Sequence, residues 1–156
     1  MSQAEELAQK FEAANAATIA SIEACGDAEW QATGEEGWTA AALAHHIAGG
    51  HAGISGIVSG IGAGGFEVPV TPEQLDAQNA AHATDFAGID KATVLDLARD
   101  GGQAAAAALR AMSETQLAES AELFGQSMTA AEVAENILIG HVVGHLESFK
   151  ATTGQG

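Results

Sequence analysis

The sequence predicts an all-α protein, a four-helix bundle that forms a single domain over residues 1–156. Hydrophobic residues make up 47% of the chain, and many of them are alanine, which has the highest intrinsic helix propensity. Tyrosine is absent and β-branched residues are sparse. Four long segments also carry hydrophobic residues at the three- and four-residue spacing of an amphipathic helix, which indicates a bundle.

The first two predicted helices span about residues 4–25 and 40–59. Gly26 and Asp27 end the first, and the stretch EWQATGEEG that follows is expected to be a loop. Thr39 is a suitable N-cap for the second helix, and Trp38 can pack on Leu43 as a hydrophobic staple. The run GIGAGG is expected to break this helix.

A long crossover, residues 61–89, carries one short predicted helix from Pro72 to about Phe86. It begins with a capping box of Thr71 and Gln74. Asp90 can cap the third main helix, at about 91–112. A long crossover between helices 2 and 3 permits these two to run parallel, which predicts an up-down-down-up order.

The last helix is predicted from the capping box at Thr129 and Glu132 to about residue 151. Glycines in the helices are interpreted as close-packing positions, as a possible local kink at Gly101 and Gly102, or as space for histidine rings. They are Gly49, Gly53, Gly56, Gly60, Gly101, Gly102, Gly140 and Gly144.

The charge of the chain limits its partners. Lys and Arg total 5 against 21 Asp and Glu, a formal charge of −16, so binding to nucleic acid or to an anionic membrane is not expected. One cysteine, Cys25, excludes an internal disulfide, and the N-terminus does not resemble a signal peptide. The uncharged stretch 37–66 is rich in glycine and contains histidines, so it is not expected to span a membrane. A cytoplasmic protein is predicted.

Three of the six histidines form the candidate metal site. His141 and His145 are four residues apart, so both rings lie on one face of the last helix with a rise of roughly 6 Å. Such a pair can bind one ion, as in helical zinc sites. His46 shares a face of the second helix with Leu43 and Gly50, which makes it the third expected ligand.

The remaining histidines have less specific interpretations. His45 and His51 point away from the face of His46 and are expected to be partly exposed. His82 lies in the crossover and is expected to be solvated, although it could visit the mouth of the site. Cys25 is interpreted as a small buried apolar residue. No residue is identified as a general base, and His45, His82 and Glu147 are candidates only by their proximity in sequence.

The order of these motifs resembles the DinB-like family. The run GWTAAALAHHIAG resembles its second-helix motif, in which a tryptophan (Trp38 here) precedes a metal-binding histidine (His46) by eight residues. The run NILIGHVVGHLESF resembles its last-helix motif with two histidines, and residues 75–109 resemble its crossover and third helix. The likeness covers nearly the whole chain, although the doubled His45-His46 leaves the choice between these two ligands open.

The resemblance implies a bundle with up-down-down-up connectivity, often a homodimer, and a three-histidine site for one divalent ion such as zinc or nickel. It also implies thiol chemistry, because some relatives are S-transferases that use bacillithiol or mycothiol and one is a mycothiol-dependent isomerase. Three neutral imidazoles leave at least one open position on the ion, as in catalytic sites.

Four hypotheses follow, and the last of them is a purely structural bundle whose histidines pack in the core. The first is a metal-dependent enzyme that transfers a low-molecular-weight thiol to a small electrophilic substrate. The second is a metal-hydroxide hydrolase of a small molecule. The third is a non-catalytic bundle that binds a metal or a small ligand.

Overall fold

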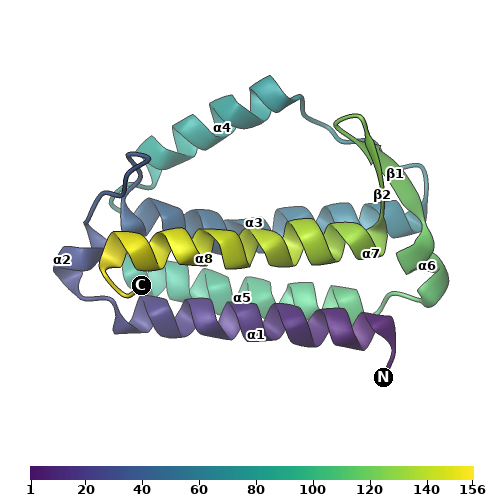
Figure 1. Ribbon diagram of the computed structural model, residues 1–156, viewed down its shortest axis with the longest axis horizontal. Helices are drawn as coiled ribbons and strands as arrows, with labels where there is room; N and C mark the ends of the chain where they lie inside the picture. Colours follow the sequence, from purple (N-terminus) through teal and green to yellow (C-terminus); the bar gives the residue numbers. More distant parts are fainter.

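Four long helical segments lie side by side in the computed structural model, which describes residues 1–156 (Figure 1). They are α1 (Gln3–Ala24), α3 (Ala40–Ala63), α5 (Lys91–Arg110) and a C-terminal segment made of α7 (Ala130–Val133), η1 (Ala134–Ile139) and α8 (Gly140–Thr153). The first and last run in one direction while α3 and α5 run in the other. The predicted all-α bundle with up-down-down-up order is therefore confirmed.

The helices begin where local sequence chemistry predicts. Each predicted N-cap side chain accepts a hydrogen bond from a backbone N–H in the first turn that follows it, which satisfies a donor that the helix itself leaves free. These residues are Thr39, Thr71, Asp90 and Thr129. Both predicted capping boxes, at Thr71 and Thr129, form.

The connections on either side of α3 differ from the prediction. The stretch expected to be a loop begins with a helical turn, α2 (Asp27–Trp30), and its buried Trp30 donates from Nε1 to the Ile89 carbonyl at 2.9 Å. This tertiary contact stabilises a turn that is too short to be stable alone. The second difference is that α3 continues to Ala63 before Gly64, at φ 85°, ends it.

A short helix and a hairpin, which the sequence did not predict, connect α5 to the last segment. They are α6 (Glu114–Ala118), β1 (Ser120–Leu123) and β2 (Gln126–Thr129). The antiparallel strands are joined by Phe124 and Gly125, whose φ angles of 50° and 83° are those of a tight hairpin turn.

The last segment contains a π-helical stretch, η1, directly before the two histidines of α8. A π turn accommodates an extra residue and rotates the side chains that follow relative to an uninterrupted α-helix. The orientation of the histidine face of α8 relative to α7 therefore depends on η1.

The core is built from small residues of α3 and larger apolar residues of its neighbours. α3 buries five alanines, at 40, 41, 42, 44 and 48. The largest apolar side chains that are fully buried include Phe11, Ile22, Ile47, Ile61, Leu109 and Phe149. Five small residues in the first turns of α3 let α5 and the C-terminal segment pack against it.

Close packing at glycine is confirmed at some positions and wrong at others. A Cβ on Gly60 would lie 2.6 Å from the Phe66 ring, so a larger residue at this position would clash with Phe66. Gly53 and Gly56 are exposed, with no atom near an added Cβ, and Gly49 is also exposed. These three face outward because α3 buries the opposite side against α5 and the last segment.

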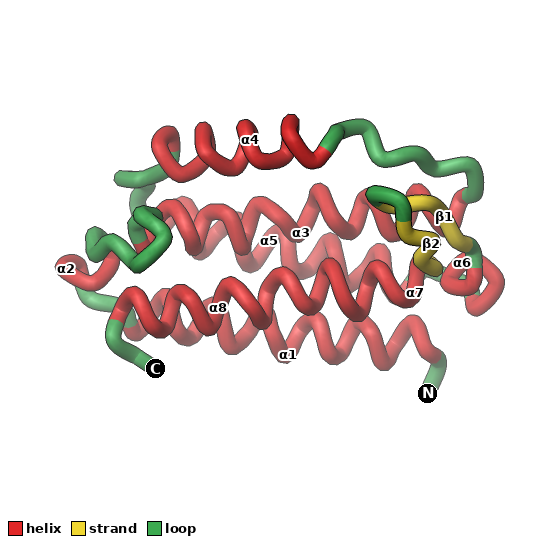
Figure 2. The backbone as a smooth tube through the Cα atoms, turned by 45° about the horizontal axis from the view of Figure 1, so that its top comes forward, coloured by secondary structure: helices red, strands yellow, loops and turns green.

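The crossover carries α4 (Pro72–Asp85), as predicted, and this helix crosses above α3 without joining the four-helix core (Figure 2). None of its residues is buried. It approaches the bundle near its C-terminal end, where His82 contacts the rings of His45 and His46 on α3.

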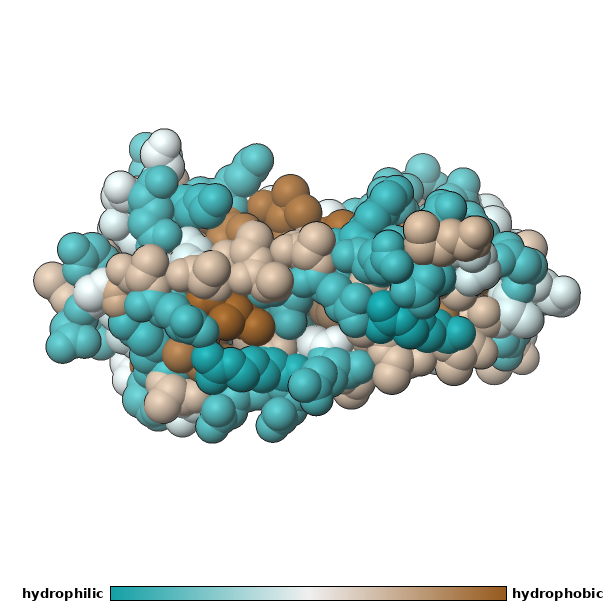
Figure 3. Space-filling view, turned by 90° about the horizontal axis from the view of Figure 1, so that it is seen from below, coloured by the Kyte–Doolittle hydropathy of each residue, from teal (hydrophilic) through white to brown (hydrophobic).

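Hydrophilic residues cover most of the face seen from below in Figure 3, with hydrophobic residues gathered near the middle. Arg110 at the end of α5 forms ion pairs with Glu5 and Glu12 of α1, and its hydrogen bonds lower the pKa of both carboxyl groups. Arg99, near the middle of α5, pairs with Glu23 near the C-terminal end of α1. No helix is both long and apolar enough to span a bilayer.

Candidate metal centre

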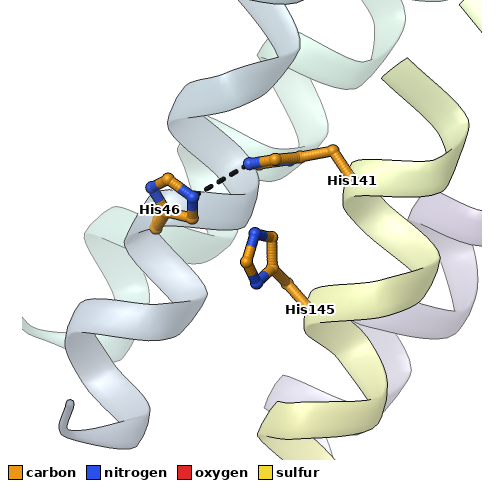
Figure 4. Close-up of side chains that lie close together, drawn as sticks. All are labelled: His46, His141 and His145. Atoms are coloured by element: carbon orange, nitrogen blue, oxygen red, sulfur yellow. Dashed lines mark hydrogen bonds between the residues drawn. The ribbon is translucent and has the colours of Figure 1, made fainter. Parts of the chain in front are cut away.

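The three predicted ligands converge at one point between α3 and α8 (Figure 4). One nitrogen from each of His46, His141 and His145 lies within 4.8 Å of the others. The Nε2 atoms of His46 and His141 are 3.0 Å apart, and the His145 ring lies 4.8 and 4.6 Å from those two rings, centroid to centroid. The structure thus brings together side chains that are about 95 residues apart in sequence.

The position of the site follows from helix periodicity and one glycine. His141 and His145 are one turn apart on α8 and both face α3. Gly50 lies one turn after His46, and a Cβ at this position would be 2.6 Å from Cε1 of His141. The missing side chain therefore makes the space that the His141 ring occupies. Gly140 and Gly144, expected to make such space, are instead exposed.

Burial keeps the three imidazoles neutral. Desolvation, together with the neighbouring imidazoles, lowers the pKa of His46 to about 4 and that of His141 to about 3. Burial also lowers the pKa of His145, although the nearby Glu36 carboxylate opposes this effect. Each ring therefore has a free nitrogen lone pair at neutral pH, which is the form that binds a metal.

The donor set fits a single first-row divalent ion. Imidazole nitrogens bind zinc at about 2.0–2.1 Å, so two of them on a tetrahedral ion are roughly 3.3 Å apart. The Nε2 atoms of His46 and His141 are 3.0 Å apart, close to this spacing. The Nδ1 atom of His141 is buried without a hydrogen-bond partner, while its Nε2 faces the ring of His46.

His45 faces away from this cluster. Its Nδ1 lies 2.9 Å from Nε2 of His82, and its ring stacks on Phe86 at 3.8 Å between centroids. Between the two adjacent histidines, His46 is the one that faces His141.

His82 was expected to be solvated but is half-buried beside the site. Its ring stacks on Trp38 at 5.8 Å and lies 5.4 Å from the ring of His46. Trp38 also contacts His46 edge to face, at 5.3 Å between centroids. His82 of the crossover and Trp38 before α3 therefore lie as two packed aromatic rings beside His46.

The expectation that His51 is partly exposed was wrong, because this residue is completely buried. Its Nε2 lies 2.7 Å from Oδ1 of Asn15, and burial lowers its pKa to about 4. The sequence does contain a signal for this burial, since His51 follows Ile47 by four residues and precedes Val58 by seven, and both are buried.

A cavity of about 320 Å³ lies between the segment before α3 and the C-terminal half of α8. Trp38 and Leu43 line this cavity, and Trp38 also contacts His46, whereas none of the three histidines lines it. The other lining residues are Thr33, Gly34, Glu35, Glu36, Ser148, Ala151 and Thr152.

Two other candidates lie outside the cluster. Glu147 is exposed on α8 and does not line the cavity. Cys25 is buried, and desolvation raises the pKa of its thiol, as befits the apolar packing residue that was predicted.

Comparison with known proteins supports the fold. No family model matches the chain, and no curated protein matches it. Among solved structures, the chain is similar to a mycothiol-dependent maleylpyruvate isomerase, crystallised as a histidine-to-alanine mutant, with a TM-score of 0.74 and 17% identity. The match covers 94% of this chain and 60% of that one, so the chain spans little more than half the length of the isomerase. At this identity the likeness shows that the two proteins share a fold.

Proposed function

We propose that His46, His141 and His145 bind one divalent metal ion, and that the protein is a DinB-like enzyme that transfers a small thiol to an electrophilic substrate. The observation that carries the proposal is the convergence of three neutral imidazoles from two helices on one point. The shared fold supports the thiol, because the structural neighbour is a mycothiol-dependent enzyme.

A divalent ion bound by the three histidines would supply a Lewis acid that lowers the pKa of a thiol beside it. In the reaction, the thiol proton passes to solvent, the sulfur forms a bond to the electrophilic carbon, and the leaving group departs with its bonding electron pair. Zinc and nickel both suit three imidazoles, since nitrogen donors bind several first-row ions.

The protein side chains have binding roles in this proposal. The cavity beside Trp38 and Leu43 holds part of the substrate or of the thiol. Trp38 and His82 pack beside His46 and limit the access of water there. No side chain near the three histidines is assigned as a general base.

Metal binding is tested first, by elemental analysis of protein purified without a polyhistidine tag. The wild-type protein is expected to contain close to one equivalent of metal, and His141→Ala or His145→Ala to contain almost none. His45→Ala is the matched control and should retain its metal, because His45 faces His82. Unchanged metal content in the His141 and His145 variants would refute their role as ligands.

Thiol transfer is tested with the electrophile monochlorobimane and a panel of thiols that includes mycothiol and bacillithiol. Consumption is expected only when the metal-loaded protein and a matching thiol are both present. Turnover of small esters or amides without any thiol would favour the hydrolase instead. Ligand binding by calorimetry without turnover would favour a non-catalytic binding protein.

The homodimer stays a prediction, and light scattering on the metal-loaded protein tests it.

A further inference from the structure

A buried polar pair lies in the bundle core and has no role in the function proposed above. His51 of α3 is completely buried, and its Nε2 lies 2.7 Å from Oδ1 of Asn15 on α1. The amide nitrogen of Asn15 donates to the Ala98 carbonyl of α5 at 2.9 Å. Gly102 of α5 leaves the space for this amide, because an added Cβ would overlap it. Burying polar groups costs free energy unless they are hydrogen-bonded. Here α1, α3 and α5 together provide the hydrogen-bond partners and the space for this pair.

The hydrogen bonds fix the tautomer of His51. Since the Asn15 nitrogen is used by Ala98, the Asn15 oxygen faces His51 and can only accept. His51 must therefore donate from Nε2. The ring is neutral because burial lowers its pKa to about 4, so its Nδ1 carries a lone pair and is an acceptor.

Two buried side-chain atoms in the whole molecule have no hydrogen-bond partner, and they are Nδ1 of His51 and Nδ1 of His141. When Nε2 of a neutral imidazole binds a metal, the proton of the ring is on Nδ1. His141 thus presents an unpaired donor in the metal-bound state, and His51 presents an unpaired acceptor. The two needs are complementary.

His141 also packs against the part of α3 that carries His51. Gly50 directly precedes His51 in α3, and a Cβ on Gly50 would be 3.0 Å from Nδ1 of His141. His51 is also among the groups whose charge would lower the pKa of His141. A single buried water can link two such nitrogen atoms where a direct bond is too long.

We propose that Asn15 and His51 form a second layer beneath the metal centre, in which one buried water accepts the Nδ1 hydrogen of His141 and donates to Nδ1 of His51. His51 is a positioning residue: it holds His141 in the tautomer that directs Nε2 to the metal, and Asn15 holds His51 in turn. Histidine ligands commonly need such a partner for their second nitrogen. This inference rests on the metal-binding part of the proposed function and is independent of catalysis.

Two substitutions at His51 separate positioning from simple packing. His51→Leu fills the space but removes the acceptor, whereas His51→Asn is smaller and places an amide oxygen near the position of Nδ1. Zinc affinity is measured by competition with a chromophoric chelator, and the stability of the metal-free protein by denaturant unfolding with EDTA. His45→Asn is the control on the other face and should keep wild-type affinity.

We expect His51→Leu to bind zinc about 10–100-fold more weakly than wild type. His51→Asn should bind within a few-fold of wild type although it is the less stable variant without metal. The order of affinity is then opposite to the order of stability, which a packing role alone does not produce. Wild-type affinity in His51→Leu, or affinities that follow stability, would overturn the second layer.

Histidine ¹⁵N NMR on the zinc-loaded wild type gives an answer that needs no variant to fold. The expected pattern is a proton on Nδ1 and zinc on Nε2 of His141, with a proton on Nε2 of His51. Zinc on Nδ1 of His141, or a proton on Nδ1 of His51, would overturn the proposal while leaving the metal site intact. A wild-type protein that binds no zinc would instead refute the metal site itself.

Discussion

Two glycines one turn apart on α3 have opposite environments. Gly50 faces α8, where the His141 ring occupies the space of its missing side chain, while Gly53 is exposed with no neighbouring atom within reach of a Cβ. A methyl group added to the first must displace the His141 ring, and one added to the second meets only solvent. The geometry of the three-histidine cluster therefore depends on the absence of one side chain.

We expect Gly50→Ala to weaken zinc binding at least tenfold, because the new methyl group would lie 2.6 Å from the His141 ring and push it from the cluster. Chelator competition measures the change. Gly53→Ala is the matched control, and it should leave affinity unchanged while raising the free energy of unfolding by up to ~1 kcal/mol, since alanine favours a helix interior over glycine. Equal affinities in the two variants would contradict this role of Gly50.

At the scale of single elements, α4 is the most weakly attached helix. None of its residues is buried, in contrast to the twelve buried residues of α3. It contacts the bundle through His82, which packs on Trp38 and His45. Phe86, which directly follows α4, stacks on His45. Elements with few buried apolar contacts open with low free energy.

Amide hydrogen exchange in α4 is therefore expected to be much faster than in α3 when followed by mass spectrometry. Phe86→Ala should accelerate it further, because it removes the ring that stacks on His45. Leu75→Ala serves as the control, since Leu75 is already 39% exposed and should change little. Protection in α4 equal to that in α3 would show that the helix is held by other forces.

At the scale of the whole molecule, the stability of the metal-free protein is linked to pH through its buried histidines. His51 has an ordinary pKa of 6.5 when unfolded and about 4 when folded, because burial penalises the charged ring. Between these values only the unfolded state binds the proton. The stabilisation is complete above pH 6.5 and is lost as the pH falls towards 4.

For His51 alone this linkage amounts to about 3 kcal/mol between pH 7 and pH 4, from roughly 1.4 kcal/mol for each pKa unit. Urea unfolding in EDTA at several pH values should show stability falling through this window. The slope should be smaller in His51→Leu, which lacks the titrating group. A wild-type stability that is flat from pH 7 to pH 4.5 would contradict the burial of neutral histidines.

Local chemistry in the sequence determined where the main helices begin and that the two histidines of the last helix share one face. N-caps such as Thr39 and Thr129 act on the adjacent turn only, and the four-residue spacing of His141 and His145 places both on one face in any helix. Both features are independent of the rest of the fold, so they were predictable.

Only the tertiary structure decided what the histidines of α3 contact. α3 is rich in alanine and glycine, so its sequence has little hydrophobic contrast between faces, and the burial of a face depends on which helices pack against it. That packing separated His46, which faces His141, from His45, which faces His82. It also placed His51 against Asn15, a contact between helices that no local pattern specifies.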